Sequence, residues 1–428
     1  MRINKVVYRS YYFLIIVIGF TSCSSSEENL NIENRLNVHF NNEGTLRTSD
    51  YFDKIEFIPL ETTKESMVRY ISDIRVKDGR IYAFSGAPDN KINIYTDYGE
   101  FISSIGRKGE GPGEIGWATD FEVDTTIVIL DRSPSKLIYY SLDGEFLNEI
   151  RTPKMYTRFS TLDKEHMALF ESDVVVKANH SDNKSVDSKL AVWNYDVTSI
   201  VDICATTLDL KPNYMSSYIL KNNFTLNDDD LYYWEAHCDT ICRLDLNTFK
   251  SEPYLKLNMG EYQISEKKMD ELFGTQADQG LGLLKAIHLD YAILDNYLIF
   301  NNGLYWLSFR MGSKSPYCGF QKTGEEVLNC YQELELDNLI SGLIVGYGFG
   351  ELVELYYDQE STMYFLWNTS DFIEAFRKLK ESYPTKKYEQ FLESRTDIKK
   401  MLEQYKTTDD PMLVKMSFIT TRNNEEIL

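Results

Sequence analysis

One sequence repeat strongly limits what this chain can fold into. The segment DYGEF at residues 97–101 recurs as LDGEF at residues 142–146, 45 positions later, and each copy lies between two β-rich runs. A period of this length, built from four short strands, is typical of one blade of a β-propeller. Because one blade cannot bury its own faces, two clear copies predict a ring of several blades.

Turn residues and runs of β-forming residues predict the strands of successive blades. We expect them at 71–77, 81–85, 92–96 and 101–106; at 120–123, 127–131, 137–142 and 146–151; at 158–162, 166–171, 189–194 and 200–205; at 223–227, 231–235, 241–246 and 253–259; and at 287–294, 297–302 continuing toward 310, 316–321 and 327–331. The chain is therefore expected to be all-β, with a six-bladed β-propeller of four-stranded blades over residues 51–428.

The sixth blade is predicted to combine both ends of the chain. Strands are expected at 351–357, 362–367 and 412–420, and residues 55–60 supply the missing outer strand. Such pairing closes a propeller ring and removes an open strand edge. Helical spacing predicts two insertions, a short helix at about 265–276 and a C-terminal helical pair within about 371–406.

The first residues have the pattern of a secretory signal. Three basic residues precede an apolar stretch at 11–20, and Thr21 and Ser22 precede Cys23. The stretch is too short for a typical membrane span, and nothing apolar follows Cys23, which weighs against a true membrane helix. The segment resembles a bacterial lipoprotein signal, which implies that residues 1–22 are removed and Cys23 is lipidated. Residues 23–50 then form a lipid-anchored tether and lead-in.

Composition sets limits on partners. With 43% hydrophobic and 14% aromatic residues, the chain can bury a large core. Its net charge of −21 repels phosphate backbones, so nucleic acid is not expected as a partner. We expect a membrane partner through the Cys23 lipid, in the cell envelope as an outer-membrane lipoprotein, either surface-exposed or periplasmic.

The cysteines leave two alternatives open. Cys238 and Cys242 flank a turn beside His237, which suits buried structural thiols better than a metal site that lacks a fourth ligand. Cys318 and Cys330 lie on either side of a hairpin turn, one residue out of register, so a disulfide bond between them is compatible with the sequence without being required.

The first hundred residues of the predicted ring resemble a known family. The matching segments are FIPLET at 57–62, ISDI at 71–74, RIYAF at 80–84 and IGRKGEGPGE at 105–114. They resemble the six-bladed β-propeller lipoproteins of Bacteroidetes, which are similar to NHL-repeat proteins. The resemblance implies a six-bladed ring on a lipid anchor and brings no catalytic residues with it.

A loop between the two clear repeats is the candidate ligand-binding region. Residues Arg107, Lys108, Glu114 and Trp117 cluster in the crossover 107–118, and Arg132 is expected on the same face. Aromatic platforms beside charged donors suit sugar rings or peptides. In the alternative interpretation the loop is only a connector, with Trp117 packed under it. A phosphate cradle is not favoured, because no helix follows the glycines.

Two functions follow from these patterns. The first is a non-catalytic binding or scaffold propeller for a glycan, a peptide or an envelope protein, with no catalytic, cofactor or metal residues. It is favoured because common enzyme motifs such as Gly-x-Ser-x-Gly and His-Glu-x-x-His are missing. The alternative is a metal-centred enzyme of the lactonase or lyase kind, with Asp73, Asp120 and His288 as candidate residues in the central channel.

Overall fold

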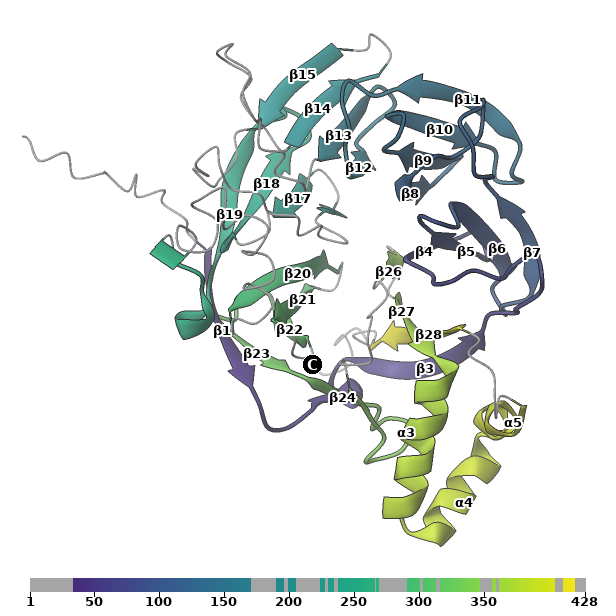
Figure 1. Cartoon of the computed structure of the whole chain (residues 1–428). Coiled ribbons are helices and arrows are strands. Elements are labelled where there is room, and N and C mark those ends of the chain that lie inside the picture. Colours follow the sequence, from purple (N-terminus) through teal and green to yellow (C-terminus); the bar gives the residue numbers. More distant parts are fainter. Residues whose placement is uncertain are drawn as a thin grey trace, which may run out of the picture.

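The computed structural model shows a mostly β, propeller-like fold whose sheets surround a common centre (Figure 1). The structure describes residues 34–170, 190–195, 199–204, 224–227, 230–234, 238–265, 267–268, 291–300, 303–312, 316–346, 356–358, 362–404 and 411–419. Most of the predicted helix at 265–276 lies outside these residues.

Two sheets come from the two clear repeats. Their antiparallel strands are β4 (Asp73–Lys77), β5 (Arg80–Ser85), β6 (Lys91–Thr96) and β7 (Phe101–Ile105), and β8 (Ala118–Val123), β9 (Ile127–Asp131), β10 (Lys136–Tyr140) and β11 (Phe146–Arg151). The repeated segment is the turn before the last strand of each sheet. Gly99 and Gly144 have φ of +87° and +92°, a left-handed conformation that glycine adopts without steric cost.

Most of the remaining strands form four further groups. One sheet contains β12 (Arg158–Thr161), β13 (His166–Phe170), β14 (Leu190–Asn194) and β15 (Ser199–Cys204). Two meanders follow, β16 (Phe224–Asn227), β17 (Asp230–Trp234), β18 (Thr240–Asp245) and β19 (Ser251–Asn258), then β20 (Ala292–Ile299), β21 (Leu304–Met311), β22 (Tyr317–Lys322) and β23 (Val327–Tyr331). A small sheet pairs β2 (Leu46–Arg47), β24 (Glu333–Glu335) and β25 (Ile344–Gly346).

One strand joins the two meanders into a nine-stranded sheet. Strand β1 (Asn34–Asn41) lies between β19 and β23 and runs parallel to both. Its Leu36 pairs with Leu257 and its Val38 with Leu328, and these four side chains are buried in one core cluster. This strand is not predicted by the sequence patterns, which place its residues in the lead-in.

The two ends of the chain meet in another sheet, as predicted. Its strands are β26 (Tyr356–Asp358), β27 (Thr362–Asn368), β28 (Pro411–Phe418) and β3 (Phe52–Pro59). The outer strand β3 runs antiparallel to β28, with Pro59 opposite Met412 and Phe52 opposite Phe418. Figure 1 shows the segment from β1 to β3 following the outside of the sheets.

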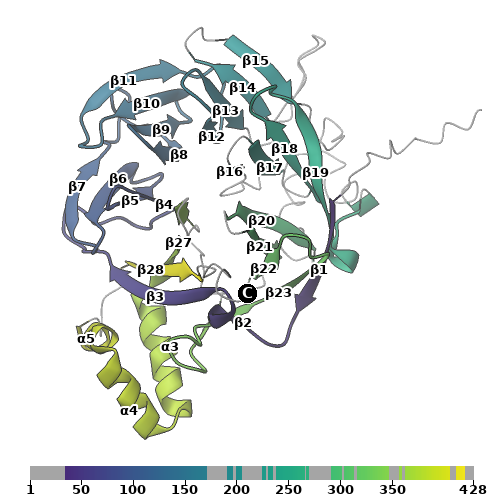
Figure 2. The same cartoon turned by 180° about the vertical axis from the view of Figure 1, so that it is seen from behind.

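Three helices lie outside the sheets, beside β3 and β28 (Figure 2). They are α3 (Thr369–Ser382), α4 (Thr385–Ser394) and α5 (Thr396–Gln404). The predicted helical pair is therefore wrong in one detail, because its second helix is interrupted at Arg395, whose side chain is turned onto Asp397 of the next helix with nitrogen–oxygen distances of 3.0 and 2.7 Å. Among the described helices, none is long and apolar enough to cross a membrane.

The predicted strand break at residues 295–296 is also wrong. Strand β20 continues through this point with a register shift between Leu294 and Asn296, and Arg310 bonds to Asp295 at 3.1 Å. The turn comes later, where Gly303 has φ of +76°. Asp-Asn is a common turn signal. Here the two residues form a β-bulge within the strand, and Arg310 pairs with the Asp295 carboxylate.

Truncation of Leu36 tests the packing of β1. Because this side chain is fully buried against both meanders, Leu36→Ala should lower the free energy of unfolding by about 2–4 kcal/mol. His39→Ala, at an exposed position of the same strand, should change it by less than about 0.5 kcal/mol. Urea denaturation of both variants measures the difference, and equal small effects would show that β1 is not part of the core.

Candidate functional site

The crossover loop between β7 and β8 is an ordered structure. The Ile115 amide donates to the Arg107 carbonyl at 2.8 Å, and the Gly109 amide donates to the Ile115 carbonyl at 3.1 Å. The Ile115 side chain is fully buried in the core between the first two sheets. Arg107 pairs with Glu114, with Nε 3.5 Å from Oε1. The Ile115 side chain therefore anchors the loop in the core, and main-chain hydrogen bonds connect its first and last residues.

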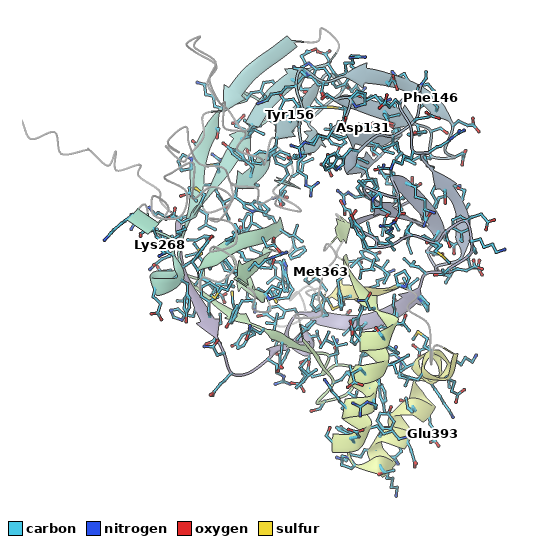
Figure 3. The ribbon with its side chains drawn as sticks, in the orientation of Figure 1. Asp131, Phe146, Tyr156, Lys268, Met363 and Glu393 are labelled. Carbon is cyan, nitrogen blue, oxygen red and sulfur yellow. The ribbon has the colours of Figure 1, made fainter. Side chains whose placement is uncertain are left out.

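A buried aspartate positions the end of this loop. The carboxylate of Asp131, which is 0% exposed, accepts hydrogen bonds from the amides of Gly116 and Trp117 at 2.7 Å each and of Ser133 at 3.2 Å. The Arg132 amide donates to the Trp117 carbonyl at 2.9 Å. Figure 3 labels Asp131 within this sheet. Hydrogen bonds to the charged form of a carboxylate are strong, so the backbone here is held rigidly.

A second clamp comes from the preceding sheet. The side chain of Asn90, in the β5–β6 loop, donates to the Gly116 carbonyl at 3.0 Å and accepts from the Ala118 amide at 3.2 Å. A Cβ atom on Gly116 would lie only 2.1 Å from the Ser133 carbonyl oxygen, so this approach requires glycine. The crossover and the two neighbouring loops therefore share one face, as predicted.

The Trp117 side chain is exposed, although its backbone is held rigidly. The residue is 51% exposed, and the guanidinium carbon of Arg132 lies 5.8 Å from its ring centre, within cation–π range. Trp117 is therefore not packed under the loop. We call Trp117 and Arg132 together the Trp117–Arg132 platform.

The five predicted ligand-binding residues fall into two pairs and a remainder. Arg107 is paired with Glu114, and Trp117 with Arg132, while Lys108 forms an isolated parallel bridge with Ile115. The residues that support the loop were not predicted from the sequence. The buried Lys136 ammonium lies 2.8 Å from a Glu149 carboxylate oxygen and 3.4 Å from the Gly111 carbonyl oxygen. The only sequence signal for these contacts would have been a lysine at the end of a strand beside a glycine-rich loop.

A charged cluster lies on the innermost strands β4, β8 and β12. Arg75 pairs with Asp73, and its guanidinium carbon lies 4.9 Å from the ring centre of Phe121. Asp120 accepts from the Phe121 amide at 3.0 Å and from the Phe159 amide of the next sheet at 2.9 Å. The predicted channel residues Asp73 and Asp120 are thus buried on inner strands and bound to an arginine or to amides, whereas His288 lies outside the described residues.

Burial controls the charge state of this cluster. It raises the pKa of Asp120 to about 7, although the nearby guanidinium groups of Arg158 and Arg75 lower it. Burial also raises the pKa of Glu122, against hydrogen bonds from Thr161 that lower it. Within the described ranges, no group of three or more His, Cys, Asp or Glu residues could hold a metal ion.

The cysteine alternatives are partly resolved. Cys318 lies opposite Tyr331 in the hairpin, so Cys318 and Cys330 are out of register and project from opposite faces into different core clusters. They form no disulfide bond, and burial raises the pKa of the Cys330 thiol. Cys238 and Cys242 are both buried, while His237 lies outside the described residues.

Comparison with known proteins relates the chain to one family and to two solved folds. The family described as "Domain of unknown function (DUF4934)" matches residues 31–417. A crystal structure of a Bacteroides fragilis protein described as exported is similar with a TM-score of 0.66 and 17% identity, covering 90% of this chain and 100% of that chain. A DUF4221 family member from Bacteroides vulgatus is similar with a TM-score of 0.51 and 11% identity, covering 86% and 96%. No curated protein matches the sequence.

Asp131 is expected to control the order of the crossover loop. Asp131→Ala leaves three amides without their acceptor, which should cost about 3 kcal/mol or more of unfolding free energy. Trypsin should then cleave faster after Arg107 or Lys108. Asp124→Ala, at an exposed carboxylate of the same sheet, is the matched control in limited proteolysis. Equal cleavage rates for both variants would contradict this role.

Asp120 should make stability depend on pH. Its pKa is about 7 in the folded chain and about 3.9 when unfolded, so between these values the folded state binds more protons. The free energy of unfolding therefore falls as pH rises from about 4 to about 7, by roughly 4 kcal/mol at most. Above about pH 7 the contribution of Asp120 is constant. Asp120→Asn should remove the dependence in urea denaturation at successive pH values, whereas parallel curves for the two proteins would refute it.

Proposed function

Since the chain belongs to the family of the domain of unknown function DUF4934 and has a propeller-like fold, we propose that it is an exported, lipid-anchored, six-bladed β-propeller that binds a glycan without catalysis. The observation that carries the proposal is the Trp117–Arg132 platform, an exposed indole whose backbone is fixed by a buried aspartate. The similar Bacteroides fragilis structure, described as exported, agrees with this location.

The six-bladed ring of NHL-like type is supported by how the sheets meet. Inner strand β4 contacts β26 and β8, β8 contacts β12, and β16 contacts β20. The first and last parts of the chain share one sheet through β3 and β28. This arrangement is expected of four-stranded blades packed around an axis, with the last blade completed by both ends.

The lipid anchor is supported by the sequence before β1. Cys23 follows a signal-like segment, and β1 begins soon after it, at Asn34. Strand β1 is hydrogen-bonded to two meanders, so a lipid on Cys23 would hold the ring close to the membrane through a firmly attached strand. The proposed location is the outer membrane of the cell envelope, facing either the surface or the periplasm.

A glycan suits the platform because of its shape and chemistry. The face of an indole stacks on the apolar face of a sugar ring, and a guanidinium group donates charge-assisted hydrogen bonds to hydroxyl groups. The platform is held before any ligand arrives, which lowers the entropy cost of binding. A peptide or an envelope protein is the competing ligand. The metal-centred enzyme is less favoured, because Asp73 and Asp120 already bind an arginine or backbone amides.

Trp117→Ala should abolish most glycan binding. Loss of the stacking surface should weaken affinity about tenfold or more, equivalent to about 1.4 kcal/mol, with little effect on stability because the side chain is half exposed. Polysaccharide affinity electrophoresis of the purified chain measures this, using neutral and acidic glycans. Tyr98→Ala removes a 79% exposed aromatic residue from another turn and should bind normally. Failure of every glycan, or equal binding by both variants, would exclude the proposed ligand class.

A further inference from the structure

We propose that a cavity between the β16–β19 and β20–β23 meanders is a second binding site, which takes a neutral saccharide of one or two sugar units. The cavity has a volume of about 810 Å³, within the range of about 300–1,000 Å³ typical of small-molecule sites. It is distinct from the Trp117–Arg132 platform and does not depend on it.

Three tyrosines from both meanders form its wall. Tyr254 lies on β19, Tyr297 on β20 and Tyr305 on β21. The rings of Tyr297 and Tyr305 are stacked, with centres 5.9 Å apart and planes 12° apart. Tyr232 connects the two sides, because its ring is 4.8 Å from Tyr254 and 6.3 Å from Tyr297. Aromatic walls of this kind provide flat surfaces for sugar rings.

The hydroxyl groups of Tyr254 and Tyr297 remain protonated at neutral pH. Burial raises the pKa of Tyr254 to about 12, and the neighbouring phenol of Tyr305 raises it further. Burial likewise raises the pKa of Tyr297 far above its usual value. A protonated phenol both donates and accepts a hydrogen bond, which matches the hydroxyl groups of a saccharide.

The hydroxyl group of Tyr297 is buried without a hydrogen-bond partner among the described residues. The Tyr297 side chain is fully buried at the cavity wall. Buried polar atoms in native proteins are nearly always paired, so an orphan beside a cavity points to a group that arrives with a ligand.

The remaining lining selects for a neutral polar ligand. Arg35 and Lys256 contribute positive charge, and Glu325 and Glu326 balance it. Lys256 is also 3.8 Å from Asp239. An anion therefore gains little, and an apolar ligand would cover polar lining groups such as Arg35 and Lys256 without hydrogen-bonding to them. A polyhydroxylated, uncharged molecule satisfies both conditions.

The cavity and the platform belong to different sheets. The cavity is lined by the β22–β23 turn and by the start of β1, whereas the platform belongs to the β9–β10 loop and the crossover before β8. The two proposed sites therefore share no residue.

Calorimetric titration of the purified full-length chain tests the site. The probes are glucose, galactose, N-acetylglucosamine, maltose, cellobiose and lactose, with glucuronate as the charged counterpart. We expect at least one neutral sugar to bind with a Kd below about 1 mM and glucuronate to bind more weakly. Tyr305→Ala, at a half-buried wall position, should weaken this binding about tenfold or more. No binding by any neutral sugar, or equal binding of glucuronate, would overturn the proposal.

Further variants separate the ligand role from folding. Tyr297→Phe removes the orphan hydroxyl, so the melting temperature should stay unchanged or rise while affinity falls about threefold to tenfold. Tyr233→Phe removes a buried hydroxyl that bonds Ser251 at 2.5 Å outside the cavity, so it should lower the melting temperature and leave sugar affinity unchanged. Trp117→Ala should also leave this affinity unchanged. A failure of the proposed platform can therefore be distinguished from a failure of the proposed cavity site. A lower melting temperature for Tyr297→Phe, or unchanged affinity in Tyr305→Ala, would refute the assignment.

Discussion

The pairing of open strand edges is the constraint on which this fold depends. A strand at the rim of a sheet exposes unpaired main-chain groups, which invite association with other chains. Strand β1 satisfies two such rims at once, because it binds β19 on one side and β23 on the other, and β3 covers the rim of β28. The segment from β1 to β3 therefore fixes neighbouring sheets relative to one another and also supplies part of the cavity wall.

Buried aspartates recur as organisers of the backbone. Asp73 and Asp120 occupy inner strands and accept the amide of the next residue, and Asp120 also reaches across to the following sheet. Asp131 serves a loop in the same manner, since its two oxygens bind three amides. Each carboxylate uses backbone groups that would otherwise be unpaired, so the same chemistry sets the spacing of the sheets and the position of the platform.

Much of the architecture could be predicted from local signals. The strands around Gly99 and Gly144 were found because turn residues and apolar runs are encoded within a few positions. Strand β1 was missed although Leu36, Val38 and Phe40 alternate with polar residues, because its partners lie more than two hundred residues away. The misplaced turn at Asp295 has a similar cause, since Arg310 on the neighbouring strand decides its conformation.

The candidate sites show the same division between local and distant information. Trp117 and Arg132 could be proposed together because both belong to loops whose face follows from the repeat. The tyrosine cavity could not, because Tyr254, Tyr297 and Tyr305 lie on strands of two different meanders and no spacing rule connects them. The raised pKa of Asp120 could not be predicted from the sequence either, because burial in the folded chain determines it.

The position of β1 in the chain has a consequence for the order of folding. Its bond from the Asn37 amide to the Glu326 carbonyl joins residues 289 positions apart, so the contact forms only after most of the chain exists. During synthesis, however, the capping strands β1 and β3 are made before the rims that they cover. Each rim can therefore be covered as soon as it forms, which shortens the time during which a partly folded chain exposes edges to its neighbours.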